Sequence, residues 1–147
     1  GRIALVEGNY SEALTAANTA LKLNSVNKQK TEEANSMRLI AEIRALTDKF
    51  EESREAYMKA LEIDKESGDS KKIAVDLKGL GDIFLKYGRL QDAVNFYIRA
   101  YTVSRTDEDM EGASKAAESL ADAYRKSGDD KKAEEILKTK MPLDKKK

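Results

Sequence analysis

The sequence repeats itself every 40 residues without a gap, and this feature constrains the fold of the 147-residue chain more than any other. When the sequence is shifted by this period, five columns of small, large or turn residues fall into the same frame. The columns are Gly1, Ala41, Gly81 and Ala121; Ala13, Ser53, Ala93 and Ala133; Ala17, Tyr57, Tyr97 and Leu137; Ala20, Ala60 and Ala100, a set that Lys140 breaks; and Gly8, Asp48, Gly88 and Gly128. Periods of this length are typical of proteins built from stacked supersecondary units.

Each repeat is predicted to contain two helices, and the whole chain to be all-α. It has one proline and is rich in Ala, Leu, Lys and Glu, which favour helices. In the third repeat, one helix is expected over about 70–87, a turn at Gly88, and a second helix over about 90–105. The gapless frame predicts seven principal helices, preceded by a remnant over residues 1–7, and no strand. Pro142 is expected to end the last helix.

Gly81 lies inside a predicted helix, where glycine costs roughly 1 kcal/mol relative to alanine. Two antiparallel helices can approach closely only where side chains are small, so Gly81 and Ala93 are predicted to lie in the contact between the helices of one repeat. Tyr97 would fill the space that these small residues leave. The buried stripe of the first helix is expected to be Leu77, Leu80 and Phe84.

The spacing of Leu77, Leu80, Gly81 and Phe84, followed by Ala93, Tyr97 and Ala100, resembles the tetratricopeptide repeat, with Leu77 where that family usually has Trp. The fourth repeat carries the same pattern as Ala117, Leu120, Ala121, Tyr124, Ala133 and Leu137, and the second carries a weaker version. The common repeat of the family has about 34 residues, so the chain resembles its longer-repeat variety.

The resemblance implies a right-handed superhelix, or α-solenoid, of antiparallel helix pairs. We expect one domain over residues 1–141, with a partial repeat at 1–27, full repeats at 28–67 and 68–107, a last repeat at 108–141, and a frayed tail at 142–147. It also implies a non-enzymatic module that binds a protein or peptide on the concave face formed by the first helix of each repeat.

Composition excludes several kinds of chemistry. The chain has no Cys, which excludes disulfides and thiolate metal sites, and no His, which removes the commonest general base. Lys and Arg balance Asp and Glu at 27 each, so no net charge attracts nucleic acid. No apolar run approaches the roughly 20 residues that a membrane helix needs. We therefore expect no catalytic residues, no cofactor, no nucleic-acid partner and no membrane insertion.

One acidic pattern matches the spacing of an EF-hand calcium loop: Asp107, Asp109, Glu111, Gly112 and Glu118. The repeat frame instead puts a helix over about 111–126, which forbids the loop conformation. Acidic residues at a helix N-terminus already complement the helix dipole. We expect no metal site here.

The candidate binding residues lie on the first helix of each repeat, on the stripe opposite the core. They mix both charges, and the proposed set is Asn35, Arg38, Glu42, Lys78, Asp82, Lys115, Glu118, Asp122 and Arg125. The chaperone-binding members of the family hold a terminal carboxylate with Lys and Asn in this region. Here Glu42 and Asp82 follow the cations, so no such clamp is expected.

Two alternative functions stay open at this level: a structural segment for self-association, and a regulatory arm of a larger protein, with an exported bacterial protein among the options. The truncated first repeat predicts an edge at Leu14, Ala17 and Leu21 that could form a homodimer. The chain begins without Met on a helical pattern, from which we infer that an upstream segment has been removed. The compartment, cytoplasmic or exported, stays undetermined.

Overall fold

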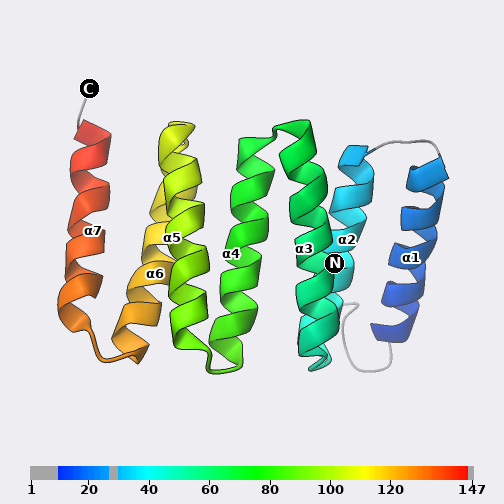
Figure 1. Ribbon diagram of the computed structural model, residues 1–147, viewed down its shortest axis with the longest axis horizontal. Helices are drawn as coiled ribbons and strands as arrows, with labels where there is room; N and C mark the ends of the chain where they lie inside the picture. Colours follow the sequence, from blue (N-terminus) through cyan, green and yellow to red (C-terminus); the bar gives the residue numbers. More distant parts are fainter. Residues whose placement is uncertain (1–9, 27–29, 146–147) are drawn as a thin grey trace. The chain divides into compact units, whose positions relative to one another are not determined.

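The computed structural model describes residues 10–26 and 30–145, and this part of the chain forms seven helices and no strand (Figure 1). The helices are α1 (Tyr10–Val26), α2 (Lys30–Leu46), α3 (Phe50–Ser67), α4 (Ser70–Lys86), α5 (Leu90–Thr106), α6 (Met110–Lys126) and α7 (Asp130–Lys145). The prediction of seven helices in an all-α chain is confirmed over these residues. The expected remnant at 1–7 lies outside them.

The chain divides into two compact units, 1–68 and 69–147. In the first unit α2 packs against both α1 and α3, and in the second unit α4 to α7 pack in sequence, each against the next. A weaker contact joins α4 to α6. The boundary lies within one residue of the predicted limit between the second and third repeats. The prediction of a single domain stays a prediction.

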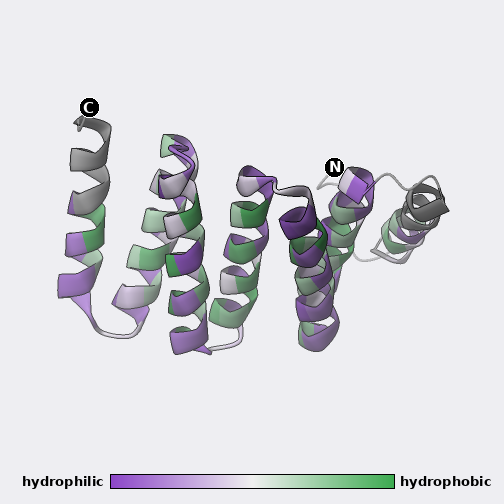
Figure 2. Cartoon of the chain, turned by 45° about the horizontal axis from the view of Figure 1, so that its top comes forward, coloured by the Kyte–Doolittle hydropathy of each residue, from purple (hydrophilic) through white to green (hydrophobic). Residues whose placement is uncertain are grey.

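The core of the second unit follows the predicted pattern. Hydrophobic and hydrophilic residues alternate along its helices, as amphipathic packing requires (Figure 2). Leu77, Leu80 and Phe84 are all buried, at 1%, 0% and 6% exposure. Phe84 also stacks on Phe96 of α5, with ring centroids 5.3 Å apart. These contacts confirm the predicted stripe and hold α4 against α5.

Gly81 is the point where the ring of Tyr97 lies against the α4 backbone. A Cβ added to Gly81 would stand 2.5 Å from one ring carbon of Tyr97, closer than real Cβ contacts come. Tyr97 is 1% exposed, and Ala93, one turn earlier on α5, is completely buried. The role predicted for Tyr97 is therefore confirmed, while direct contact between Gly81 and Ala93 stays a prediction.

The end of the last helix differs from the expectation. α7 continues to Lys145 and passes through Pro142, although the helix was predicted to end at this proline. Proline removes a single backbone hydrogen bond and crowds the carbonyl four residues earlier, which can kink a helix without ending it. The expected tail at 142–147 is therefore helical as far as Lys145.

Left-handed backbone conformations mark the turns between helices. Gly88 and Gly128 have φ of 79° and 86°, and Asp48, in the same column of the repeat, has φ of 60°. Gly68 and Glu108 form a second such pair, with φ of 72° and 59°. Asp48 and Glu108 thus adopt a conformation that glycine adopts without a steric penalty.

Replacing Glu108 by glycine is expected to stabilise the protein by about 1 kcal/mol, because the substitution relieves left-handed strain at an exposed turn. Urea unfolding measures the change. The reverse substitution at the equivalent turn, Gly68→Ala, is the matched control and should destabilise by a similar amount. A Glu108→Gly variant that is less stable than the wild type would contradict the assignment of left-handed strain to this turn.

The predicted edge on α1 is only partly described. Ala17 is buried and Leu14 is half-buried, while the side chain of Leu21 lies outside the described part. Since α1 packs on α2, Ala17 already has cover within its own unit. Dimerisation through this edge stays a prediction.

Candidate functional site

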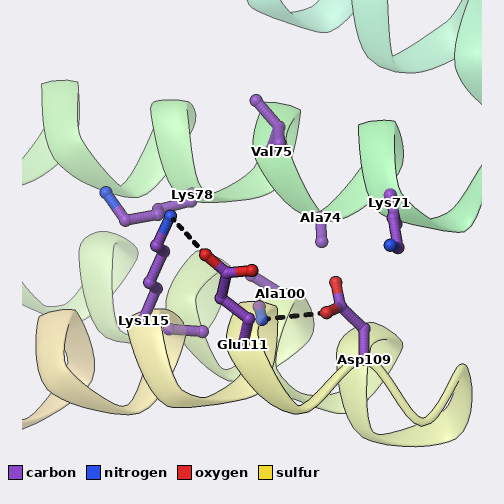
Figure 3. Close-up of a pocket in the computed structure, with 10 residues that line it drawn as sticks. Lys71, Ala74, Val75, Lys78, Ala100, Asp109, Glu111 and Lys115 are labelled. Atoms are coloured by element: carbon purple, nitrogen blue, oxygen red, sulfur yellow. Dashed lines mark hydrogen bonds and ion pairs between the residues drawn. The ribbon is translucent and has the colours of Figure 1, made fainter.

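A pocket of about 230 Å³ opens between α4 and α6 in the second unit, and we call it the α4–α6 pocket (Figure 3). It combines small apolar residues with charged ones from both helices. Its lining residues are Lys71, Ala74, Val75, Lys78, Ala100, Asp109, Glu111, Gly112, Lys115 and Ala116. The space stays open because three of its lining residues are alanines, whose side chains are single methyl groups. They come from the three helices that meet here: Ala74 on α4, Ala100 on α5 and Ala116 on α6.

Two of the predicted binding residues, Lys78 and Lys115, line this pocket from opposite sides (Figure 3). Each also pairs with an acid on its own helix: Lys78 with Asp82 at 3.3 Å, and Lys115 with Glu111 at 3.5 Å. Both are i,i+4 pairs at the surface, and such pairs stabilise a helix by only about 0.3–0.5 kcal/mol. A bound ligand with an acidic group can therefore compete for these lysines at little energetic cost.

Asp109 has a structural task at the rim of the pocket. It is the N-cap of α6, and its carboxylate accepts a hydrogen bond from the backbone N–H of Gly112 at 3.1 Å. α6 begins at Met110, so Glu111 and Glu118 are helical and cannot form the calcium loop considered from the sequence. Among the described residues no group of three or more acidic, His or Cys side chains could hold a metal ion.

Asp82 connects the pocket to the core. The hydroxyl of Tyr97 donates a hydrogen bond to Oδ1 of Asp82, while Lys78 pairs with Oδ2. Burial, together with the hydrogen bond to the Asp82 carboxylate, raises the pKa of Tyr97 far above its usual range. The hydroxyl therefore remains a proton donor and fixes the position of the Asp82 side chain.

In the first unit, Arg38 lies in a different environment from that expected of a binding residue. Its Nη1 is 2.7 Å from Oδ2 of Asp64 on α3, and the two side chains are only 12% and 2% exposed. Arg38 also donates a hydrogen bond to Asn35. This buried ion pair joins α2 to α3, which gives Arg38 a structural role. Asn35 and Glu42 are exposed on α2.

The remaining candidates lie along α6, away from the pocket lining. Glu118, Asp122 and Arg125 are all exposed, and Arg125 pairs with Asp122 at 3.3 Å. The structure therefore brings Lys78 and Lys115 together and leaves these three further along the same helix.

Three lining residues of the pocket, Lys71, Asp109 and Glu111, were not among the predicted binding residues. Val75, on the same helix stripe as Lys78, is the most exposed apolar side chain of the pocket, with 53% of its surface exposed. Asp109 had a signal in the sequence, since an acid directly before a helix is a typical N-cap. Glu111 appeared only in the acidic pattern considered for calcium, and Lys71 had no signal, because their place at the pocket depends on how α4 and α6 pack.

Antiparallel helices that repeat in a fixed frame, with small residues in their contacts, define a helical-repeat protein. The tetratricopeptide repeat family matches residues 1–66 and 32–106, and a second family description of the same repeat matches residues 116–147. The chain therefore belongs to the tetratricopeptide repeat family, whose members are protein-interaction modules. No curated protein sequence matches it significantly.

Solved structures with the same fold extend this comparison. BtubC (BKLC) from P. vanneervenii is 22% identical, with a TM-score of 0.79 over 92% of this chain and 57% of that one. A Rap protein complexed with Competence and Sporulation Factor is 18% identical, with a TM-score of 0.82 over 91% of this chain and 38% of that one. The tetratricopeptide domain of Arabidopsis FLU is 20% identical, with a TM-score of 0.69 over 80% of this chain and 99% of that one.

At these identities the likeness concerns the fold. This chain spans 57% of BtubC and 38% of the Rap protein, so the activities of those longer proteins are not carried over to it. No helix in the described ranges is both long enough and apolar enough to cross a membrane.

Proposed function

We propose that this chain binds a peptide segment of a partner protein on the face formed by α4 and α6. The observation that carries the proposal is the α4–α6 pocket itself, where Lys78 and Lys115 from successive repeats meet across apolar residues. At about 230 Å³ the pocket is smaller than the roughly 300–1,000 Å³ of typical small-molecule sites, so it fits one or two side chains of a peptide better than a cofactor.

The chemistry of the face favours a ligand of mixed character. Val75 supplies exposed apolar surface, and Lys78 and Lys115 have long side chains whose ammonium groups can reach a ligand. Beyond the pocket, Glu118, Asp122 and Arg125 continue the face along α6 and are proposed to contact flanking residues of the same peptide. On the first unit, Asn35 and Glu42 are proposed as ligand contacts on α2, with Arg38 holding Asn35 in place.

The similar Rap protein was solved in complex with Competence and Sporulation Factor, which supports the use of this fold for holding a partner. The proposal concerns binding alone, and a non-catalytic role is expected, as is typical of tetratricopeptide repeats.

Charge reversal of the pocket tests the proposed function. The double variant Lys78→Glu and Lys115→Glu is expected to abolish affinity capture of the partner, because it replaces both cations of the pocket with acids. Circular dichroism checks that the variant stays helical. Lys131→Glu, an exposed lysine on α7, is the matched control and should capture the partner as the wild type does.

One combination of results would contradict the proposed function. Unchanged capture by the double variant, together with loss of the partner in Arg99→Glu on α5, would show that binding takes place on a different helix face and that the proposed function is wrong.

A further inference from the structure

Lys78 and Ser104 occupy the same positions in the third repeat as Arg38 and Asp64 occupy in the second. We propose that Lys78 is a ligand-binding cation, which pairs with an Asp or Glu side chain of a bound peptide, whereas its counterpart Arg38 is structural. The inference rests on the proposed function and deepens it, since it names the ligand chemistry that the α4–α6 pocket selects.

The two repeats differ in the residue at one position of the second helix, which is Asp64 in the second repeat and Ser104 in the third. Asp64 holds Arg38 in a buried ion pair that leaves the arginine side chain 12% exposed. Ser104 has no charge with which to hold Lys78, and the Lys78 side chain is 36% exposed and lines the pocket. The cation at this position is thus neutralised by a buried acid in the second repeat, whereas in the third repeat it lines a pocket.

Ser104 provides a second sign that a polar group beside the pocket lacks a partner within the described part of the chain. The residue is 2% exposed, and its Oγ has no hydrogen-bond partner within the part of the chain that the structure describes. That oxygen lies beside Gly112 of the pocket lining, 2.8 Å from the point where a Cβ would stand. Buried hydroxyls are normally hydrogen-bonded, so an unpaired one next to a pocket is unusual.

The charges around the pocket favour an acidic ligand group. Three lysines line it, Lys71, Lys78 and Lys115, against two acids, Asp109 and Glu111. Asp109 is occupied by capping α6, and Glu111 pairs with Lys115. Asp82 shares its carboxylate between Lys78 and the Tyr97 hydroxyl. An ammonium group has three N–H donors, so Lys78 can bind a ligand carboxylate without leaving Asp82.

The apolar part of the pocket indicates which kind of residue stands next to the acidic residue of the ligand. Ala74, Ala116 and the exposed Val75 form a surface that would bury an aliphatic side chain of the ligand. The occupant is therefore a peptide segment in which Asp or Glu stands next to Leu, Ile or Val.

The test uses short synthetic peptides that are N-acetylated and C-amidated, so that the only carboxylate is that of a side chain. One set places Glu beside an aliphatic residue, and a matched set has Gln in place of Glu. With the full chain, the Glu set is expected to bind about two- to fivefold more tightly than the Gln set, as for a solvent-accessible ion pair. The preference should fall as salt concentration rises.

Variants then assign the preference to Lys78. Lys78→Arg keeps the positive charge and leaves Ser104 unchanged, so it should keep the preference for Glu. Lys78→Arg combined with Ser104→Asp rebuilds the Arg38–Asp64 pair of the second repeat and should remove it. Since a new buried carboxylate can impair folding, Lys78→Gln is the second variant, and it should remove the preference without a change in helicity.

Three outcomes would overturn the inference. Peptides that bind the pocket, as shown by a loss of binding in Val75→Asp, but without preference for Glu would leave the proposed function intact and refute the role of Lys78. A preference seen only with a free C-terminal carboxylate would refute the side-chain assignment. Peptides unaffected by Val75→Asp and by the Lys78 variants would refute both the inference and the proposed function.

Discussion

Replacing Arg38 by alanine is expected to destabilise the helices of the first unit by about 3–5 kcal/mol, because it leaves the Asp64 carboxylate buried without its cation. Nη1 of Arg38 and Oδ2 of Asp64 are 2.7 Å apart, and Asp64 is 1% exposed. Hydrogen exchange of the α2 and α3 amides measures the change locally, which avoids assuming that the two units unfold together.

A double variant separates the value of the pair from the penalty of breaking it. Arg38→Met with Asp64→Leu removes both charges and fills the space with apolar atoms, so its stability is expected to lie within about 1 kcal/mol of the wild type. If Arg38→Ala alone were equally mild, the pair would be solvated in solution and the structural role assigned to Arg38 would be wrong.

Replacing Gly81 by leucine is expected to destabilise the second unit by about 3 kcal/mol. Even a single Cβ at this position would stand 2.5 Å from the Tyr97 ring, which is 1% exposed, and leucine would add further carbons in the same place. A leucine side chain would push α4 and α5 apart and break the hydrogen bond between Tyr97 and Asp82. Thermal unfolding measures the loss.

Gly81→Ala is the matched control, and its effect should be much smaller. Alanine gains about 1 kcal/mol of helix propensity over glycine, which offsets part of the overpacking. The second repeat already combines Ala41 with Tyr57, both buried, so a small adjustment accommodates the methyl group. A Gly81→Leu variant that melts at the wild-type temperature would refute the packing described for α4 and α5.

Much of the helix layout could be predicted because a repeat presents the same local signals several times. The expected limits of the third repeat, about 70–87 and 90–105, differ by one residue each from α4 and α5. The stripe of Leu77, Leu80 and Phe84 followed from helical periodicity alone. Pro142 was misjudged because one proline near a helix end removes too little hydrogen bonding to stop the helix.

The site was less predictable, for physical reasons. Lys78 and Lys115 could each be placed on the predicted binding face of its own helix, because the position of a residue around a helix follows from the period of that helix alone. The partner of Arg38 could not be found in this way, since Asp64 lies on another helix, 26 residues further along the chain. Lys71 and Glu111 belong to the pocket only through the packing of α4 and α6, which no single-helix pattern contains.

The contacts within each unit run mainly between helices that follow one another in the chain. A nascent chain can therefore complete each hairpin as soon as its second helix has left the ribosome, without waiting for distant residues. We expect assembly to follow the order of synthesis, from α1, α2 and α3 in the first unit to α4, α5, α6 and α7 in the second. A stretch of sequence duplicated or deleted in whole repeats would leave that order workable, which is a route by which such arrays change length.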